Sequence, residues 1–441
     1  MSSSARAQTP DCKKYDTNTP LTNDLLKPGL LPPCEPSVTG KPDTDFVTPL
    51  KMLRHGFDLY SWLTFAALNS PADRTRAIGQ GAGPKGDAPT IWESYKQLQD
   101  VMLPDGSKPA PWQEDNAVFP PACERLSGPG KFVIHMQEET FNQPFKSGPL
   151  IDQNGHYALF VILMNRPMFE YIVDNQLYSR KGQEAFAKTV EFPTGSNTAP
   201  AGGTIGAVMI KGAWKILGSG DDRARFHAVD ALIYTPASPD GKAPATCVEK
   251  TVGLVGLHVA HKTSHAPQWV WTTFEHVDNV PTDADVAANK LKAHYNFYDP
   301  GCDVVKCPIN QLPPWPWEPR LRNPERPFTD FKSQIVRTVL APTQDDVDKI
   351  NAAAQSLAGL KDTVWANYML VTTQWPTDFQ NKTDPTGVPA PPVLANSTLE
   401  TFSQGKVPIA SSSCMGCHNN ATTHHNPATR SDFTFIPEKA Q

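Results

Sequence analysis

Four consecutive runs rich in β-branched and aromatic residues constrain the fold of this chain more than any other feature. They occupy residues 204–217, 226–235, 247–261 and 268–277, and clusters of Gly, Pro, Asp and Ser bound each of them. Runs of this composition between turn residues are typical of β-strands. Because no helical pattern alternates with them, the sequence predicts a central antiparallel sheet.

Helical patterns lie on both sides of these runs, so the sequence predicts an α+β fold in which helices flank the sheet. Pro167 is expected to kink or divide one of these helices. Thr90 and Glu93 have the spacing of a capping box at the start of another. The expected helices are Val47–Leu68, 90–98, 157–178, 328–340, 343–360, 364–372 and 397–404, and a further strand is expected at 131–136.

Composition excludes several classes of partner. A net charge of −5 gives no cationic excess with which to bind nucleic acid or anionic lipid. The longest apolar run, 157–164, is too short to span a bilayer. The 44 prolines would suggest disorder in a chain poor in aromatics, but with 10 Trp and 20 Phe they predict long, ordered, proline-rich loops.

Changes in composition along the chain predict that it is organised in three segments. Residues 1–45 are rich in Pro, Thr and Asp and read as an extended arm, 46–395 form the α+β body, and 396–441 form a C-terminal segment. Ala5-Arg6-Ala7 has the small-x-small form of a signal peptidase site, so cleavage after Ala7 is expected. This predicts an exported protein, periplasmic or secreted.

The C-terminal segment contains the motif Cys414-Met415-Gly416-Cys417-His418. This C-x-x-C-H spacing is the signature of c-type haem attachment. Two thiols at this separation can form thioethers to the two vinyl groups of one porphyrin, and the imidazole of the next residue then reaches the iron. The alternatives are a chance match, a disulfide or half of a zinc site, but the chain has no second CxxC. The sequence therefore predicts one covalent haem c, bound by Cys414 and Cys417 with His418 as proximal ligand.

Six cysteines remain outside the motif, an even number that allows three disulfides. The local pairs Cys12 with Cys34 and Cys302 with Cys307 would leave Cys123 with Cys247. Reduced core thiols are the alternative. Disulfides and haem attachment both require an oxidising compartment, which agrees with export.

The motif lies only 23 residues (441 minus 418) before the end of the sequence, which leaves little chain for a separate cytochrome domain. The haem segment is therefore expected to dock on the body. The sixth iron ligand stays open between a histidine, a methionine of the body and an open coordination position. His424 lies close in sequence, while His258 and His261 fall on opposite faces of an expected strand. All three are weak candidates, because a histidine that packs in the core or is solvated at the surface is commoner than an iron ligand. The same holds for His425, which adjoins His424. Trp269, Trp271, Glu275, His276 and Asp278 follow on the next expected strand and could line a haem pocket, although alternating aromatics in a strand usually pack the core.

Several longer stretches together resemble bacterial exported proteins of the cytochrome c family, in which a large uncharacterised body precedes one C-terminal CxxCH. The resemblance implies haem c at Cys414, Cys417 and His418, and it implies no role for the other motifs. It covers most of the chain from Phe57 onward. The stretches are FDLYSWLTFAALNSP, APTIWESYK, EFPTGS, KGAW, GLVGLHVAHKT, QWVWTTFEHVDNVP, WANYMLVTTQWP, SSSCMGCHNNAT and SDFTF.

Three functions follow from one haem on a large body. The first is a monohaem cytochrome that transfers electrons to or from a partner protein or a small molecule. The second is a haem-dependent oxidoreductase, a peroxidase or oxygenase with an open distal site, because the body is larger than electron transfer requires. The third is a binding or sensor module that reports on a ligand or on redox state. Other catalytic motifs, such as a P-loop, HExxH or GxSxG, do not occur.

Overall fold

The computed structural model describes most of the body and the whole motif segment. It covers residues 20–23, 47–72, 89–112, 119–128, 131–196, 204–238, 240–263, 266–303, 305–314, 331–338, 344–376, 389–405 and 412–441. The expected arm at 1–45 lies outside the described residues except for 20–23, and the expected pair Cys12 with Cys34 lies outside them entirely.

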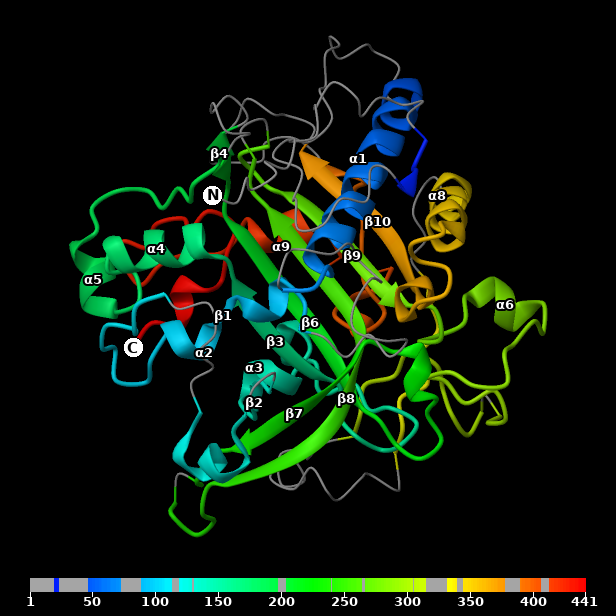
Figure 1. Cartoon of the computed structure of the whole chain (residues 1–441), viewed down its shortest axis with the longest axis horizontal. Helices are drawn as coiled ribbons and strands as arrows, with labels where there is room; N and C mark the ends of the chain where they lie inside the picture. Colours follow the sequence, from blue (N-terminus) through cyan, green and yellow to red (C-terminus); the bar gives the residue numbers. More distant parts are fainter. Residues whose placement is uncertain are drawn as a thin grey trace, which may run out of the picture.

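The fold is α+β, built on a large curled sheet with helices around it (Figure 1). The main path through the sheet is β1-β3-β6-β8-β9-β10-β11, and its neighbours are antiparallel; β7 also pairs with β8, and β2 runs parallel to β7. The bounds are β1 Lys96–Gln97, β2 Val133–His135, β3 Leu159–Met164, β6 Val208–Ile216, β7 Ala228–Thr235, β8 Thr246–His261, β9 Val270–His276, β10 Tyr368–Pro376 and β11 Pro389–Ala390. A separate two-stranded sheet pairs β4 Gly195–Ser196 with β5 Thr204–Ile205.

Strand β8 is the central strand of the sheet. It is 16 residues long and pairs with other strands along both of its edges. On one edge it pairs with β6 over Val252–His261. On the other edge β7 pairs with its first half and β9 with its second half. All four strand-like runs from the sequence are therefore confirmed as β6, β7, β8 and β9, and the expected strand at 131–136 is confirmed as β2.

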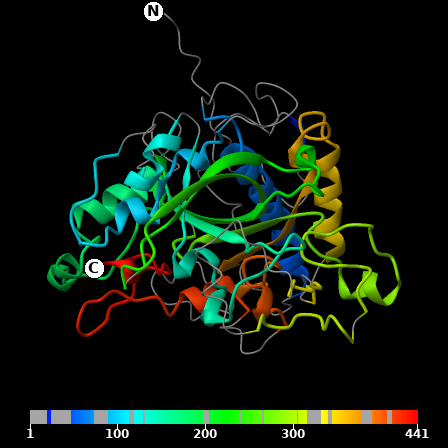
Figure 2. The same ribbon diagram turned by 90° about the horizontal axis from the view of Figure 1, so that it is seen from below.

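Helices and apolar side chains cover both faces of the sheet. α1 (Val47–Leu68) and α8 (Gln344–Ser356) pack on one face, over a core that includes Leu257 and Phe274. The other face carries Met209, Ala260 and Trp271 and is covered by the C-terminal residues. Those residues, red in Figure 2, lie along one side of the sheet. The expected helices at Val47–Leu68 and 343–360 are confirmed by α1 and α8.

Three expected helices are wrong in whole or in part. The span 157–178 divides into strand β3 and helix α4 (Arg166–Asp174), and the Asn165 side chain caps α4 by accepting from the Met168 N–H at 3.3 Å. The span 364–372 holds a short 3₁₀ turn and strand β10, and the described part of 328–340 is irregular. An apolar run covered on both faces has no polar side to reveal its period, so a strand and a helix look alike.

Two shorter expectations are confirmed only in part. Residues 90–98 form a 3₁₀ turn at Trp92–Ser94, strand β1 and the start of α2 (Leu98–Val101). Glu93 accepts hydrogen bonds from the Thr90 N–H at 2.6 Å and from its hydroxyl at 3.0 Å. The expected helix at 397–404 is a 3₁₀ turn, Thr401–Ser403.

Two of the three expected disulfides are present. Cys123 is bonded to Cys247, which ties the 3₁₀ turn Pro121–Leu126 to the start of β8. Cys302 is bonded to Cys307 within a surface loop. Among the described residues, no helix is both long and apolar enough to cross a bilayer.

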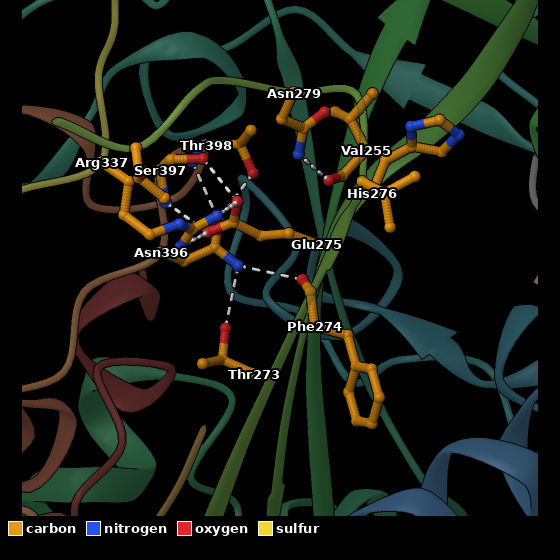
Figure 3. A network of polar contacts seen from close by, with 12 residues as sticks. Val255, Thr273, Phe274, Glu275, His276, Asn279, Arg337, Asn396, Ser397 and Thr398 are labelled. Atoms are coloured by element: carbon orange, nitrogen blue, oxygen red, sulfur yellow. Dashed lines mark hydrogen bonds and ion pairs between the residues drawn. The ribbon is translucent and has the colours of Figure 1, made fainter. Parts of the chain in front are cut away.

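A buried polar network joins residues 396–400 to strand β9 (Figure 3). Glu275 is fully buried and forms an ion pair with Arg337, whose two terminal nitrogens reach both carboxylate oxygens. The same carboxylate accepts from the Ser397 N–H at 2.6 Å and from its hydroxyl at 2.5 Å. Asn396 donates to the Thr273 hydroxyl at 2.8 Å and to the Phe274 carbonyl at 3.0 Å. These bonds fix the approach of the chain to the C-terminal segment.

Replacing Arg337 with Met is expected to lower the free energy of unfolding by about 3–5 kcal/mol, because it leaves the buried Glu275 carboxylate without its counter-charge. Chemical denaturation would measure this. Lys349→Met is the matched control, since Lys349 pairs with Asp346 on the surface and should change stability by less than about 1 kcal/mol. Equal effects of the two substitutions would contradict the role given to the network.

Candidate functional site

The motif forms a short helix, α9 (Cys414–His418). The Ser413 side chain caps it by accepting from the Gly416 N–H at 3.2 Å. Helical spacing places residues three and four apart on one face, so Cys414, Cys417 and His418 share a side of α9. Of the cysteines in the described ranges, these two are the ones outside disulfides. The helix thus presents two thiols and an imidazole together.

A glutamine on β10 attaches α9 to the sheet. The Gln374 Oε1 atom accepts from the Met415 N–H at 2.9 Å and from the Ser413 hydroxyl at 3.2 Å. Its Nε2 atom donates to the Pro391 carbonyl at 2.7 Å. Met415 is fully buried in the apolar cluster that includes Trp271, so it packs α9 against the sheet.

His418 is held in one orientation and one tautomer. Its Nδ1 lies 2.8 Å from the Phe433 carbonyl, and a carbonyl only accepts, so Nδ1 carries the proton. The Nε2 atom then keeps its lone pair. The rings of Trp271 and Phe435 lie against the imidazole, with centroids 4.7 and 5.1 Å away. Burial lowers the pKa of His418 to about 4, so the ring is neutral at pH 7. A neutral imidazole with its other nitrogen on a carbonyl is the usual form of a metal-ligating histidine.

A strained turn directs the Phe433 carbonyl toward His418. Asp432 and Phe433 both have left-handed backbone angles, φ 54° and 63°, which non-glycine residues rarely adopt. Asp432 is held by an ion pair with the buried Lys262 and by the Phe192 N–H at 2.7 Å. The Trp269 indole donates to the Asp432 carbonyl at 3.1 Å. Burial raises the pKa of Asp432, and Lys262 opposes that rise.

A cavity of about 680 Å³ adjoins this face of α9. One wall is the sheet, because cross-strand partners put Ile162 beside Lys211 and His258, and Met209 beside Ala260 and Trp271. The volume lies within the range of protein sites for cofactors and small molecules. Among the described residues, the lining is formed by Leu98, Asn142, Gln143, Pro144, Phe145, Lys146, Ile162, Met209, Lys211, His258, Ala260, Trp271, Thr272, Leu394, Glu400, Ser413, Cys414, Cys417, His418, Asn420, Thr434, Phe435, Ile436, Glu438 and Lys439.

Several polar side chains line the cavity, and among them Lys211 and His258 of the sheet lie near Glu400. The His258 Nε2 atom lies 2.7 Å from Glu400 Oε1. Burial raises the pKa of Glu400, but His258 and Lys211 outweigh it, so the carboxyl stays ionised at neutral pH. Burial lowers the pKa of Lys211, and the Glu400 charge opposes this. The Met209 sulfur accepts from the Thr434 hydroxyl at 3.2 Å.

The two thiols are not activated as nucleophiles. Burial raises the pKa of Cys417 to about 11 and that of Cys414 well above its usual value. Catalytic and redox-exchange cysteines instead have lowered pKa values. Within the described ranges, no group of three or more His, Cys, Asp or Glu side chains could hold a metal ion. These findings give no support to a thiol enzyme or a zinc centre.

The histidines considered as a sixth iron ligand differ in whether they line the cavity. His258 lines the cavity with His418. His261 is not among the lining residues, and its Nδ1 lies 2.5 Å from the Tyr60 hydroxyl of α1. Burial lowers the pKa of His261 to about 3. His424 donates from Nε2 to the Glu438 carbonyl at 2.9 Å and lies outside the lining, as does His425, whose ring bonds the Pro427 carbonyl.

Of the five residues expected as pocket lining on the following strand, only Trp271 lines the cavity. Trp269 packs on the C-terminal residues, Glu275 belongs to the network in Figure 3, and His276 and Asp278 lie outside the lining. The sequence argument missed Met209, Lys211 and Glu400. Strand alternation places Met209 and Lys211 on one face, but only the register with β8 shows that this face is shared with His258.

Comparison with family models, with curated proteins and with solved structures finds no match to this chain. The resemblance to exported cytochrome c family proteins therefore stays a prediction.

Replacing Gln374 with Leu is expected to loosen α9, because the buried Met415 N–H loses its acceptor. A loss of about 1–3 kcal/mol in the free energy of unfolding should result. In the haem-free chain, Cys417 should also react faster with a thiol reagent. Ser356→Ala, which removes an exposed hydroxyl on α8, is the control. Unchanged thiol labelling in Gln374→Leu would contradict this role.

Proposed function

We propose that this protein carries one covalent haem c and acts as a monohaem redox protein in electron transfer. Cys414 and Cys417 would form the thioethers, and His418 Nε2 would bind the iron. The observation that carries the proposal is the joint presence of two unpaired thiols and a neutral imidazole of fixed tautomer on the wall of one cavity.

The residues present fit the group chemically. The cavity has room for a cofactor, and its sheet wall offers Ile162, Ala260 and Trp271 to an apolar macrocycle. The haem would supply one-electron redox chemistry, tuned by burial and by its axial ligands. The Phe433 carbonyl would raise the basicity of His418 through the Nδ1 hydrogen bond.

An oxidising compartment is part of the proposal. The two disulfides are bonds that persist in the periplasm or outside the cell, where haem c is also attached. The partner would be a redox protein or a small electron donor or acceptor.

The first test is haem attachment itself. The protein should be expressed with a haem c maturation system, denatured on a gel and stained for haem. We expect covalent haem on the native sequence and none on the double variant Cys414→Ala, Cys417→Ala. His294→Ala is a control, since the His294 ring lies outside the cavity and is half exposed. A native chain without haem, alongside a reference cytochrome c that is loaded, would overturn the proposal.

The second test concerns the iron ligand. His418→Ala should keep covalent haem, because both thiols remain, but should change the optical and EPR spectra by removing the proximal nitrogen. An unaltered spectrum would refute His418 as a ligand.

A haem-dependent oxidoreductase is the second candidate. The cavity supports it, because it contains Lys211, His258 and Glu400 in addition to the groups that would hold haem. A six-coordinate, low-spin spectrum would favour electron transfer, with Met209 or His258 as possible sixth ligands by chemistry. A five-coordinate spectrum that responds to peroxide or oxygen would favour the oxidoreductase.

A further inference from the structure

We infer that Lys262 and Asp432 are positioning residues that fix His418 in the orientation and tautomer with which it would bind iron. The inference rests on the proposed haem function and deepens it, because it assigns control of the iron ligand to a buried ion pair outside the cavity. Neither residue of the pair lines the cavity or belongs to the attachment motif.

The first observation is the turn, residues 431–434, that carries the Phe433 carbonyl. The Thr434 N–H donates to the Ser431 carbonyl at 3.2 Å and closes the turn. Its two central residues, Asp432 and Phe433, both have left-handed backbone angles. Glycine is the usual residue at the second of these positions, and an aromatic residue rarely adopts this conformation. The local sequence therefore does not favour the turn, and contacts from elsewhere in the fold must hold it.

The second observation is that three separate parts of the chain hold Asp432. Lys262, directly after β8, forms an ion pair with its Oδ2 atom, and the Phe192 N–H donates to the same oxygen at 2.7 Å. The Trp269 indole donates to the Asp432 carbonyl at 3.1 Å. Lys262 is fully buried, and its own N–H donates to the Ala207 carbonyl at 2.9 Å. The ion pair therefore ties the turn to the end of the central strand.

The value of this ion pair lies in its direction. Apolar residues of similar size often stabilise a fold as well as a buried ion pair does, so stability alone does not explain it. The Asp432 carboxylate must face both of its donors, however, and this sets the backbone at residue 432. The backbone there sets the direction of the next carbonyl, that of Phe433. A return of either central residue to the right-handed region would turn this carbonyl away from the His418 Nδ1 atom, which lies 2.8 Å from it.

Loss of the Phe433 carbonyl would release the imidazole of His418. The proton of a neutral imidazole lies on one of its two nitrogens, and the hydrogen bond at Nδ1 decides which. Without that acceptor the proton is free to occupy Nε2, the atom that would bind iron. A metal-bound histidine also becomes a weaker electron donor when its outer hydrogen-bond partner is removed. Lys262 and Asp432 therefore act on the iron site through the Phe433 carbonyl.

The tautomer of His418 tests the positioning role without haem. The measurement is nitrogen NMR of histidine-labelled protein in the background Cys414→Ala, Cys417→Ala, which lacks both thiols of the motif. The His418 signals are those that disappear in His418→Ala. In this background we expect the Nδ1-protonated form alone. After Lys262→Met we expect a mixture of both tautomers, because the turn is no longer held.

Lys215→Met is the matched control. Lys215 is as deeply buried as Lys262 and forms an ion pair with Asp221 at 2.6 Å, and neither Lys215 nor Asp221 lines the cavity. The control removes a buried cation in the same way, so it should lower stability and leave the tautomer of His418 unchanged.

The midpoint potential of the haem-loaded protein is the second readout. Lys262→Met should raise it, because a weaker imidazole donor stabilises ferric iron less than the native one. A loss of about tenfold in the stability of the ferric form relative to the ferrous form corresponds to about 59 mV for a one-electron couple. Lys215→Met should leave the potential unchanged.

Trp269→Phe decides the matter if Lys262→Met does not fold. It removes the hydrogen bond to the Asp432 carbonyl while keeping an aromatic ring, so its effects should have the same direction and a smaller size. An unchanged His418 tautomer or an unchanged potential in the deciding variant would overturn the inference, as would equal changes in Lys215→Met. A native chain without covalent haem overturns the proposed function, whereas the NMR result in the haem-free background still decides whether the ion pair positions His418.

Discussion

The antiparallel pairing of β6 with β8 is the contact on which the candidate site depends. Because opposed residues in an antiparallel pair point to the same face, the register fixes Lys211 beside His258 and Met209 beside Ala260. A slip of β8 by one residue against β6 would turn His258 and Ala260 to the face covered by α1 and α8, away from Lys211 and Met209. The long pairing of β8 with strands on both edges makes such a shift costly, since many ladder bonds would break together.

The sequence predicted the sheet well where each run ended in clear turn residues, as in 247–261. It failed at β3 and β10, where apolar residues such as Phe160 and Val371 are covered on both sides and no period is visible. Only the packed sheet distinguishes these strands from helices.

Some residues of the candidate site could also be predicted from the sequence, and others could not. Cys414, Cys417 and His418 follow from local spacing, and the structure adds that they share a cavity wall. Lys211 and Glu400 could not be found in the sequence, because they meet His258 through strand register and through a network 142 residues away in the chain. The hydrogen bond from His418 to Phe433 could not be predicted from the sequence either. It depends on a left-handed turn at residues 432 and 433 that the residue types there do not specify.

The separation of these residues along the chain has a consequence for the order of assembly. The motif is five consecutive residues, whereas the cavity joins β3, β6, β8 and the C-terminal residues, which are distant in sequence. Contacts of high sequence separation form late, because chain closure must precede them. If haem is attached as proposed, its chemistry needs only the extended motif. The porphyrin can therefore already be present when the strands meet, so that the pocket folds around it as part of the hydrophobic core.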